Sequence, residues 1–250
     1  MNLLFITSLM IFASWIVQGI SGFGGGVFMV TLLSLVMNIK SAVLTFSFIQ
    51  ALGPFSILLV SKSYKPNIKM IFYLISGSFV GIFLGAHILK IISVPYMEIF
   101  SGLFFMSIGM FDGLAIFKNE LLNLTSKIET KHGFLVGVVS GVFSGIVGIG
   151  GPPAAIYLRN IVKEFDEYRY LISIYFVLLV GIRLFIYYML HAFSNVRYDY
   201  ILYWGIASVA GLWTGRFISR FINKRYLNLS VPFLTIICGI ILITKGVKSF

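Results

Sequence analysis

The sequence predicts an all-α integral membrane protein, and three observations carry this prediction. The chain of 250 residues is 59% hydrophobic and only 11% charged, with a mean hydropathy of +1.00. No charged side chain occurs before Lys40. Apolar runs of bilayer-crossing length, about 20 residues each, recur along the whole chain, so little of it remains for a soluble domain.

We expect about eight apolar segments, each helical, because a chain that crosses lipid must satisfy its backbone groups internally. In chain order they cover residues 3–37, 42–61, 68–90, 95–117, 133–158, 170–192, 198–222 and 227–247. The first and the fifth contain glycine clusters, which predict broken or re-entrant helices. The stretches after these clusters are too short to span at about 1.5 Å per residue, although one long kinked helix is the alternative in each case.

The two glycine clusters, called the first and second signature below, share a pattern. Residues 19–26 read G-I-S-G-F-G-G-G, and residues 145–153 read G-I-V-G-I-G-G-P-P, about half of the chain apart. Inside a membrane, unpaired backbone is tolerated only where it is buried in protein or lines a wet cavity. Matching interruptions in two halves of a chain therefore indicate the binding site of a transporter.

The basic residues predict the orientation of these segments. If each broken segment leaves the membrane on the side where it enters, most of the 19 Lys and Arg residues fall on one side. The positive-inside rule favours that arrangement, which puts both termini outside and inverts the two halves. We therefore expect a first transmembrane repeat at 1–117, a cytoplasmic linker at 118–132 and a second repeat at 133–250. Gly81-x-x-x-Gly85 and Gly211-x-x-x-Gly215, which lie at nearly the same offset, support the duplication.

Four features of the chain together resemble the TauE/SafE sulfite exporter family. They are the first signature, the apolar run after it, the stretch Ala42-Val43-Leu44-Thr45-Phe46-Ser47 and the second signature. This family is also called the 4-toluene sulfonate uptake permease group, and the resemblance covers essentially the whole chain. It implies a multi-pass inner-membrane transporter of sulfite, sulfonates or related anions. The family more often reads A-x-G-T-S in this stretch, whereas here Leu44 replaces the glycine and the serine is displaced by one residue.

The glycine backbone is the first candidate for the substrate site. Without side chains, successive N–H groups can converge, and a helix N-terminus adds partial positive charge that favours an anion. We expect helices to restart at about Val27 and Pro153, where proline suits a first helical turn. The predicted substrate-binding backbone comprises Gly24, Gly25, Gly26, Gly150, Gly151 and Pro152. The alternative is that these glycines only permit close helix packing.

Six polar side chains form a second group of substrate contacts: Ser21, Thr45, Ser47, Gln50, Ser144 and Arg183. Ser47 and Gln50 are three residues apart and share a helix face, where hydrogen bonds between helices are the alternative role. Arg183 lies near the middle of the 170–192 segment, and a charge at that depth indicates function. It could instead pair with Asp112 or hold backbone carbonyls near an unwound stretch.

These patterns predict a secondary transporter that moves a small anion, a sulfur oxyanion or organosulfonate such as sulfite, by alternating access in the bacterial inner membrane. A passive anion channel and a non-transporting assembly or scaffold protein are the alternatives. A proton or sodium ion would be the coupling partner, and Asp112 is the acidic candidate considered for it.

Other classes of protein fit less well. Gly19-Ile20-Ser21-Gly22 resembles the serine motif of rhomboid proteases, but Val147 stands at the matching position of the second signature, so we do not expect an enzyme. No cofactor is expected, since the aromatic residues are explained by interface belts and packing. The net charge of +11 is assigned to cytoplasmic loops that face anionic lipid rather than to nucleic acid.

Overall fold

The computed structural model describes residues 3–21, 24–50, 52, 54–55, 58, 64, 68–117, 130–162, 164–195, 198–221 and 224–250. Within these ranges it leaves out the side chains of Ser21 and of residues 115–117, 165–166, 169, 194–195 and 224–230. Most of the predicted linker at 118–132 and the side chain of the candidate Ser21 therefore lie outside the description.

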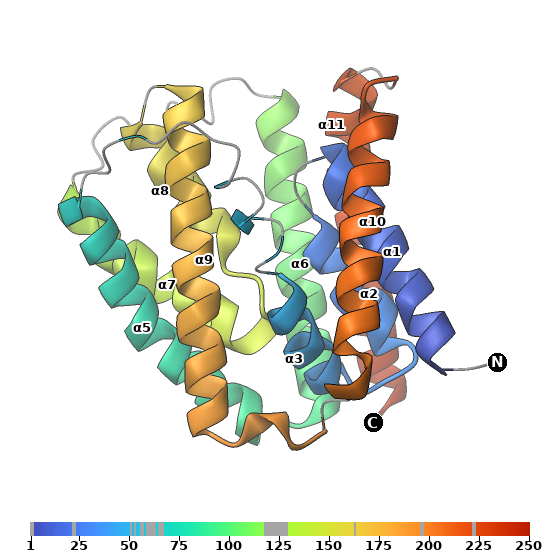
Figure 1. The fold of residues 1–250 in the computed structure, drawn as a ribbon. Helices are drawn as coiled ribbons and strands as arrows, with labels where there is room; N and C mark the ends of the chain where they lie inside the picture. Colours follow the sequence, from blue (N-terminus) through green and yellow to red (C-terminus); the bar gives the residue numbers. More distant parts are fainter. Residues whose placement is uncertain are drawn as a thin grey trace. The chain divides into compact units, whose positions relative to one another are not determined.

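The described residues form helices and connecting turns, with no strand among them (Figure 1). The helices are α1 (Leu3–Ser21), α2 (Gly25–Ser34), α3 (Ile39–Ile49), α5 (Ile68–Ile91), α6 (Val94–Phe117), α7 (Gly133–Val147), α8 (Gly151–Ile161), α9 (Phe165–Met189), α10 (Ile201–Ser219) and α11 (Lys224–Lys248). Short 3-10 turns precede α7 at Thr130–His132 and α10 at Ala192–Asn195 and Tyr198–Tyr200. The all-α prediction is confirmed for this part of the chain.

Six of the described helices are long and apolar enough to cross a membrane. Their candidate spans are Leu3–Ile20, Ile68–Ile91, Val94–Leu114, Thr130–Val147, Tyr170–Met189 and Val231–Lys248. The predicted number of eight is not confirmed, because α10 is not among the six and α3 covers only 11 residues. The chain is nevertheless a multi-pass membrane protein by the length and composition of its helices.

Both predicted helix breaks occur at the glycine signatures. Helix α1 ends at Ser21 and α2 begins at Gly25, while α7 ends at Val147 and α8 begins at Gly151. The restarts come two residues earlier than expected. Helices α2 and α8 have only 10 and 11 residues, about half of what a full crossing needs.

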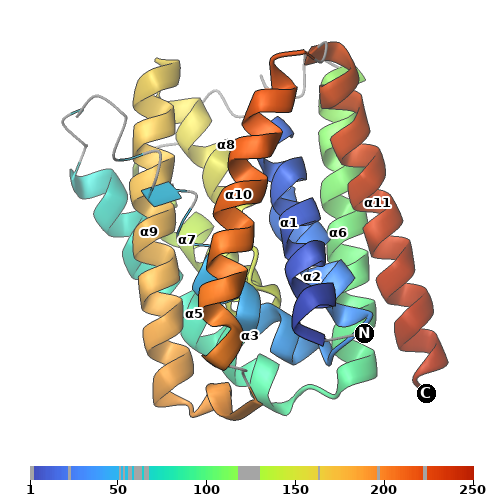
Figure 2. The same ribbon diagram turned by 45° about the vertical axis from the view of Figure 1, so that its right-hand side comes forward.

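The helices belong to two compact units that interleave along the chain. Unit 1 comprises residues 1–49, 92–124 and 195–250, and unit 2 comprises residues 50–91 and 125–194. Each unit therefore takes segments from both predicted repeats, so the repeat boundaries do not coincide with compact units and stay a prediction. Within unit 1, the chain ends Leu3 and Phe250 lie toward the same end of the helices (Figures 1 and 2).

Close glycine contacts hold the helix pairs of both units together. In unit 2, a Cβ atom at Gly85 of α5 would lie 3.0 Å from the Cα of Gly145 on α7, too close for any side chain. In unit 1, a Cβ atom at Gly215 of α10 would lie 2.9 Å from the Cα of Gly19 on α1. The same contact thus recurs in the two units, each time between a G-x-x-x-G helix and the first glycine of a signature.

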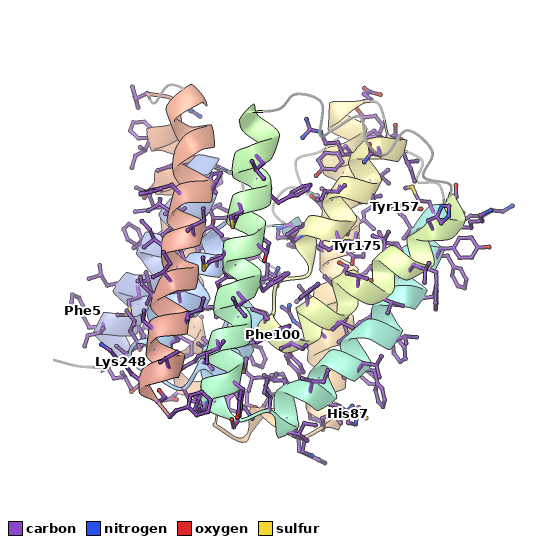
Figure 3. All side chains as sticks on the ribbon, turned by 180° about the vertical axis from the view of Figure 1, so that it is seen from behind. Phe5, His87, Phe100, Tyr157, Tyr175 and Lys248 are labelled. Carbon is purple, nitrogen blue, oxygen red and sulfur yellow. The ribbon has the colours of Figure 1, made fainter. Side chains whose placement is uncertain are left out.

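The outward surface carries the apolar side chains expected of a lipid-facing protein. Phe5 on α1 and His87 on α5 project away from the ribbon, and Phe5 is well exposed (Figure 3). Many other large hydrophobic residues on α5, α6 and α10 are exposed as well, among them Phe72, Leu103 and Trp213. An apolar surface of this extent is unfavourable in water, and it fits a hydrocarbon environment.

We predict that Gly141→Ala destabilises the protein, because its methyl group would collide with the Ser78 carbonyl and the Gly81 Cα across the α5–α7 contact. Overpacking of this kind costs about 1–3 kcal/mol, which thermal unfolding in detergent would register as a lower midpoint. The control is Gly181→Ala on α9, where a Cβ atom meets nothing within 4 Å. Equal midpoints for the two variants would contradict the packing argument.

Candidate functional site

The second break lies inside unit 2 and is formed by three glycines. Gly148 caps the end of α7 with a φ of 81°, a left-handed conformation that favours glycine. Its N–H donates to the Ser144 carbonyl at 3.0 Å. Gly150 caps the start of α8, and a Cβ atom there would strike the Ser140 carbonyl. The chain thus leaves one helix and enters the next within three residues, against the side of α7.

Helix α9 presents one buried face to this break. Tyr175, Leu179, Arg183 and Tyr187 recur every fourth residue and therefore share a side of the helix. All four side chains are fully buried. Three of them are polar, so the face of α9 that packs in unit 2 delivers hydrogen-bonding groups to the interior.

Arg183 is the charged residue of this face, and it holds the broken backbone. Its Nη1 atom donates to the Gly148 carbonyl and, at 3.1 Å, to the Ser144 hydroxyl. Its Nη2 atom donates to the Gln50 side-chain carbonyl at 2.6 Å. Three predicted site residues, Gln50, Ser144 and Arg183, therefore meet at the second break. The contact with Gly148 is the one expected of an arginine that holds carbonyls near an unwound stretch.

Two tyrosines of α9 fix the backbone on either side of this arginine contact. The Tyr187 hydroxyl donates to the Gly145 carbonyl at 2.7 Å. The Tyr175 hydroxyl lies 2.7 Å from the Ser140 hydroxyl and 2.9 Å from the Ser78 hydroxyl, and Ser140 in turn donates to the Gly150 carbonyl. Because all these groups are buried, each freed carbonyl is matched inside the protein. Figure 3 marks the position of Tyr175 among the helices of unit 2.

The start of α8 limits which backbone donors an anion could use. The first turn of a helix leaves its N–H groups without helical partners, but Pro152 and Pro153 have no N–H. Donors for a ligand at this turn are therefore confined to Gly150 and Gly151. Pro152 cannot donate a backbone hydrogen bond to a ligand, so the predicted contact at this residue would have to involve its ring.

The first break lies inside unit 1 and is built differently. Gly24 caps α2 with a φ of 89°, and the Gly25 N–H donates to the Gln18 side-chain carbonyl of α1 at 2.9 Å. A Cβ atom at Gly26 would lie 2.5 Å from the Phe46 ring. The side-chain oxygen of Gln18 thus occupies the Gly25 N–H, and Phe46 covers Gly26.

The other predicted residues lie elsewhere in unit 1. Thr45 and Ser47 are buried on α3, and the Ser47 hydroxyl donates to the Val43 carbonyl of its own helix at 2.8 Å. Gln50, which we expected to act together with Ser47, belongs to unit 2. No contact with substrate is tested for any predicted site residue, so these assignments stay predictions.

The sequence analysis missed three residues: Gln18, Ser140 and Tyr187. Two signals were available. Gln18 directly precedes the first glycine of its signature, as Ser144 does in the second. The polar residues of α9 also recur at a spacing of four, which places them on one face.

Comparison with known proteins identifies the family. The family model "Sulfite exporter TauE/SafE" matches residues 6–243, nearly the whole chain. The chain belongs to this family. Its members are transporters, so the TauE/SafE assignment and the apolar helices agree on a membrane permease. No curated protein and no solved structure matches the chain.

In the part of the chain that the structure describes, no group of three or more His, Cys, Asp or Glu side chains lies together. Cys238 is buried as a free thiol on α11. The chemistry gathered at the second break is instead that of hydroxyl, amide and guanidinium groups, which suits an oxyanion.

We predict that Tyr187→Phe destabilises the protein by about 1 kcal/mol, because it removes one buried hydrogen bond and leaves the Gly145 carbonyl without that donor. Thermal unfolding in detergent would measure the effect. Tyr188→Phe is the matched control, since Tyr188 is the next residue and is 66% exposed. A Tyr187→Phe variant as stable as the control would show that this bond does not hold the break.

Proposed function

We propose that this TauE/SafE chain is a secondary transporter of a small anion, specifically a sulfur oxyanion or organosulfonate such as sulfite. In this proposal it works by alternating access in the bacterial inner membrane. The observation that carries the proposal is a fully buried arginine at the break of a helix, in a chain whose family transports sulfite. An ionisable residue inside a membrane protein is costly and is typical of substrate pathways.

The chemistry of Arg183 supports an anionic substrate. The Ser144 hydroxyl, the Gly148 carbonyl and the Gln50 amide oxygen are neutral, so they orient the guanidinium while it keeps its positive charge. Guanidinium groups bind oxyanions through paired N–H donors. Sulfite and sulfonates present three oxygens around sulfur, which suits a site with a planar donor fork and nearby hydroxyl groups.

The glycine backbone adds neutral donors to this positive charge. The N–H groups of Gly150 and Gly151 stand at the start of α8, where the helix dipole favours an anion. In the first signature, the Gly25 N–H already binds the side-chain oxygen of Gln18, which supports our proposal that Gln18 and a substrate oxygen exchange there. Gly24 and Gly26 then shape the turn rather than donate the principal bonds.

Repeated contacts support the proposed duplication with inverted halves. Gly25 packs against the Cβ atom of Gln18 and the Ser14 carbonyl, and Gly150 packs against the Cβ atom of Ser144 and the Ser140 carbonyl. The two partners of each glycine are four residues apart in both signatures. Duplicated transporters commonly bind substrate at such broken helices.

We predict that Gly151→Val abolishes sulfite counterflow in proteoliposomes, because a branched side chain would narrow the approach to the backbone donors of α8. The assay preloads vesicles with unlabelled sulfite and follows transient uptake of labelled sulfite. The matched control is Gly181→Val, at an open position on α9. Unchanged counterflow in Gly151→Val would contradict the proposed site. Sulfite flux without any counterflow in the unaltered protein would favour a passive channel.

We predict that Arg183→Gln raises the KM for sulfite at least about tenfold, since hydrogen bonds to charged groups contribute about 1.5–3 kcal/mol. Arg183→Lys keeps the charge but loses the planar fork, so its KM should fall between the two. Rates are compared per folded protein, because Arg183 also holds Gly148. An unchanged KM in folded Arg183→Gln would remove Arg183 from the substrate site and leave it a structural role.

A further inference from the structure

A second buried charge lies in unit 1, away from both glycine signatures in the sequence. Glu98 on α6 is fully buried, and its Oε1 atom lies 2.7 Å from the Lys245 Nζ of α11. The Lys245 side chain is 30% exposed. One partner of this ion pair is therefore enclosed, while the other is within reach of solvent.

Lys245 also connects the ion pair to the first broken segment. Its ammonium group donates to the carbonyl of Ser34, the last residue of α2. Helix α2 begins at Gly25, in the first signature. The ion pair thus holds the far end of the short helix whose start we propose as part of the substrate site.

The cluster lies at the end of unit 1 that carries the chain terminus. Tyr96 on α6 contacts Phe250 with ring centroids 4.9 Å apart, and the Ser249 hydroxyl lies 3.5 Å from the Glu98 Oε2 atom. Both chain ends lie toward this end of the helices (Figure 2). The distribution of basic residues predicts that the termini face outside, so Glu98 would exchange protons with the outer solution.

The ion pair is not part of the repeated architecture. At the offset that relates Gly109 to Gly239, the residues that match Lys245 and Glu98 are Ala115 and Asn228. A pair that only fastened α6 to α11 would be expected at both related positions. A buried ion pair is moreover a poor source of stability, because desolvation offsets most of its attraction. These two arguments favour a functional role.

We propose that Glu98 is the residue that couples anion transport to protons, a role that rests on the proposed transport function. A proton from the outer solution binds the Glu98 carboxylate and converts it to the neutral acid. The neutral acid no longer holds the Lys245 ammonium, so the link from Lys245 to the Ser34 carbonyl loosens and α2 is released. Loss of the proton restores the ion pair and the position of α2.

The surroundings favour a proton over a sodium ion. The oxygens of Glu98 and Ser34 already bind an ammonium group, which a sodium ion would have to displace, whereas a proton needs only one carboxylate oxygen. The charged groups on the helices packed against α6 are basic in their described parts: Lys245 and Lys248 on α11, and Lys40 on α3.

The test compares two readouts in the same proteoliposomes. Sulfite counterflow without a pH gradient measures transport itself, and sulfite accumulation under an imposed gradient of one pH unit measures coupling, with pyranine inside to report protons. For one proton per anion, a one-unit gradient supports about tenfold accumulation. We expect the ratio of accumulation to counterflow to fall about tenfold in Glu98→Gln, along with the pyranine signal. The control, Glu164→Gln, makes the same change at an exposed carboxylate.

The outcomes separate this proposal from the transport function. An unchanged ratio of accumulation to counterflow in Glu98→Gln would overturn the coupling role. The coupling role would also be overturned if the unaltered protein moved sulfite without a pyranine signal, or accumulated sulfite only under a sodium gradient. Absence of counterflow in the unaltered protein would instead overturn the transport function. If Glu98→Gln does not fold, Lys245→Gln replaces it. Lys245→Gln removes the ammonium group through which Glu98 is linked to α2, so its ratio of accumulation to counterflow should also fall, and an unchanged ratio would overturn the proposal.

Discussion

The structure depends on one constraint, which is that backbone groups freed by a broken helix cannot turn to water inside a membrane. Each break in this chain is matched by side chains from its own unit. At the second break, Arg183, Tyr187 and Ser140 donate to the carbonyls of Gly148, Gly145 and Gly150. At the first, Gln18 accepts from the Gly25 N–H. The buried polar side chains that contact the two breaks follow from that requirement.

The two breaks meet this constraint in opposite ways. The second fixes carbonyls with several hydrogen bonds and removes two donors through Pro152 and Pro153, so little of its backbone can rearrange. The first relies on the side-chain amide of Gln18, which an incoming oxygen could replace without leaving an orphaned group. Related sequences thus produce two breaks whose backbone groups have different side-chain partners.

Sequence patterns predicted the breaks well because glycine and proline act locally. The family, the all-α class and the positions where the helices stop were all accessible before the fold was known. The partners of the helices were not. A G-x-x-x-G pattern shows that a helix packs closely but does not name the helix that it meets, so the contacts of Gly85 with α7 and of Gly215 with α1 required the structure. The glycines of each signature also divide their roles, since Gly19 and Gly145 pack helices while Gly24 and Gly148 adopt left-handed turns.

The sequence predicted a set of polar candidate residues, but it did not predict which of them lie together in the fold. Gln50, Ser144 and Arg183 meet, whereas the Ser47 hydroxyl is occupied by the Val43 carbonyl of its own helix. Seryl hydroxyls in apolar helices often bond in this way, and sequence alone does not show which of them do. Tyr187 was overlooked because aromatic residues are common in membrane helices and carry no charge to mark them.

The acidic residue that is buried in this protein could not be identified from the sequence. Asp112 drew attention because it stands near the end of an apolar segment beside Lys118, yet Glu98 on the same helix is the acid that is fully buried. Its counter-ion, Lys245, lies far away in the sequence, and only the packing of α6 on α11 brings them together. Neutral hydrogen-bonding groups hold a break without changing charge, whereas a proton that binds a carboxylate paired with an ammonium group removes one charge of the pair. In this protein the neutral contacts hold the breaks of both units, whereas the buried ion pair of Glu98 and Lys245 lies in unit 1.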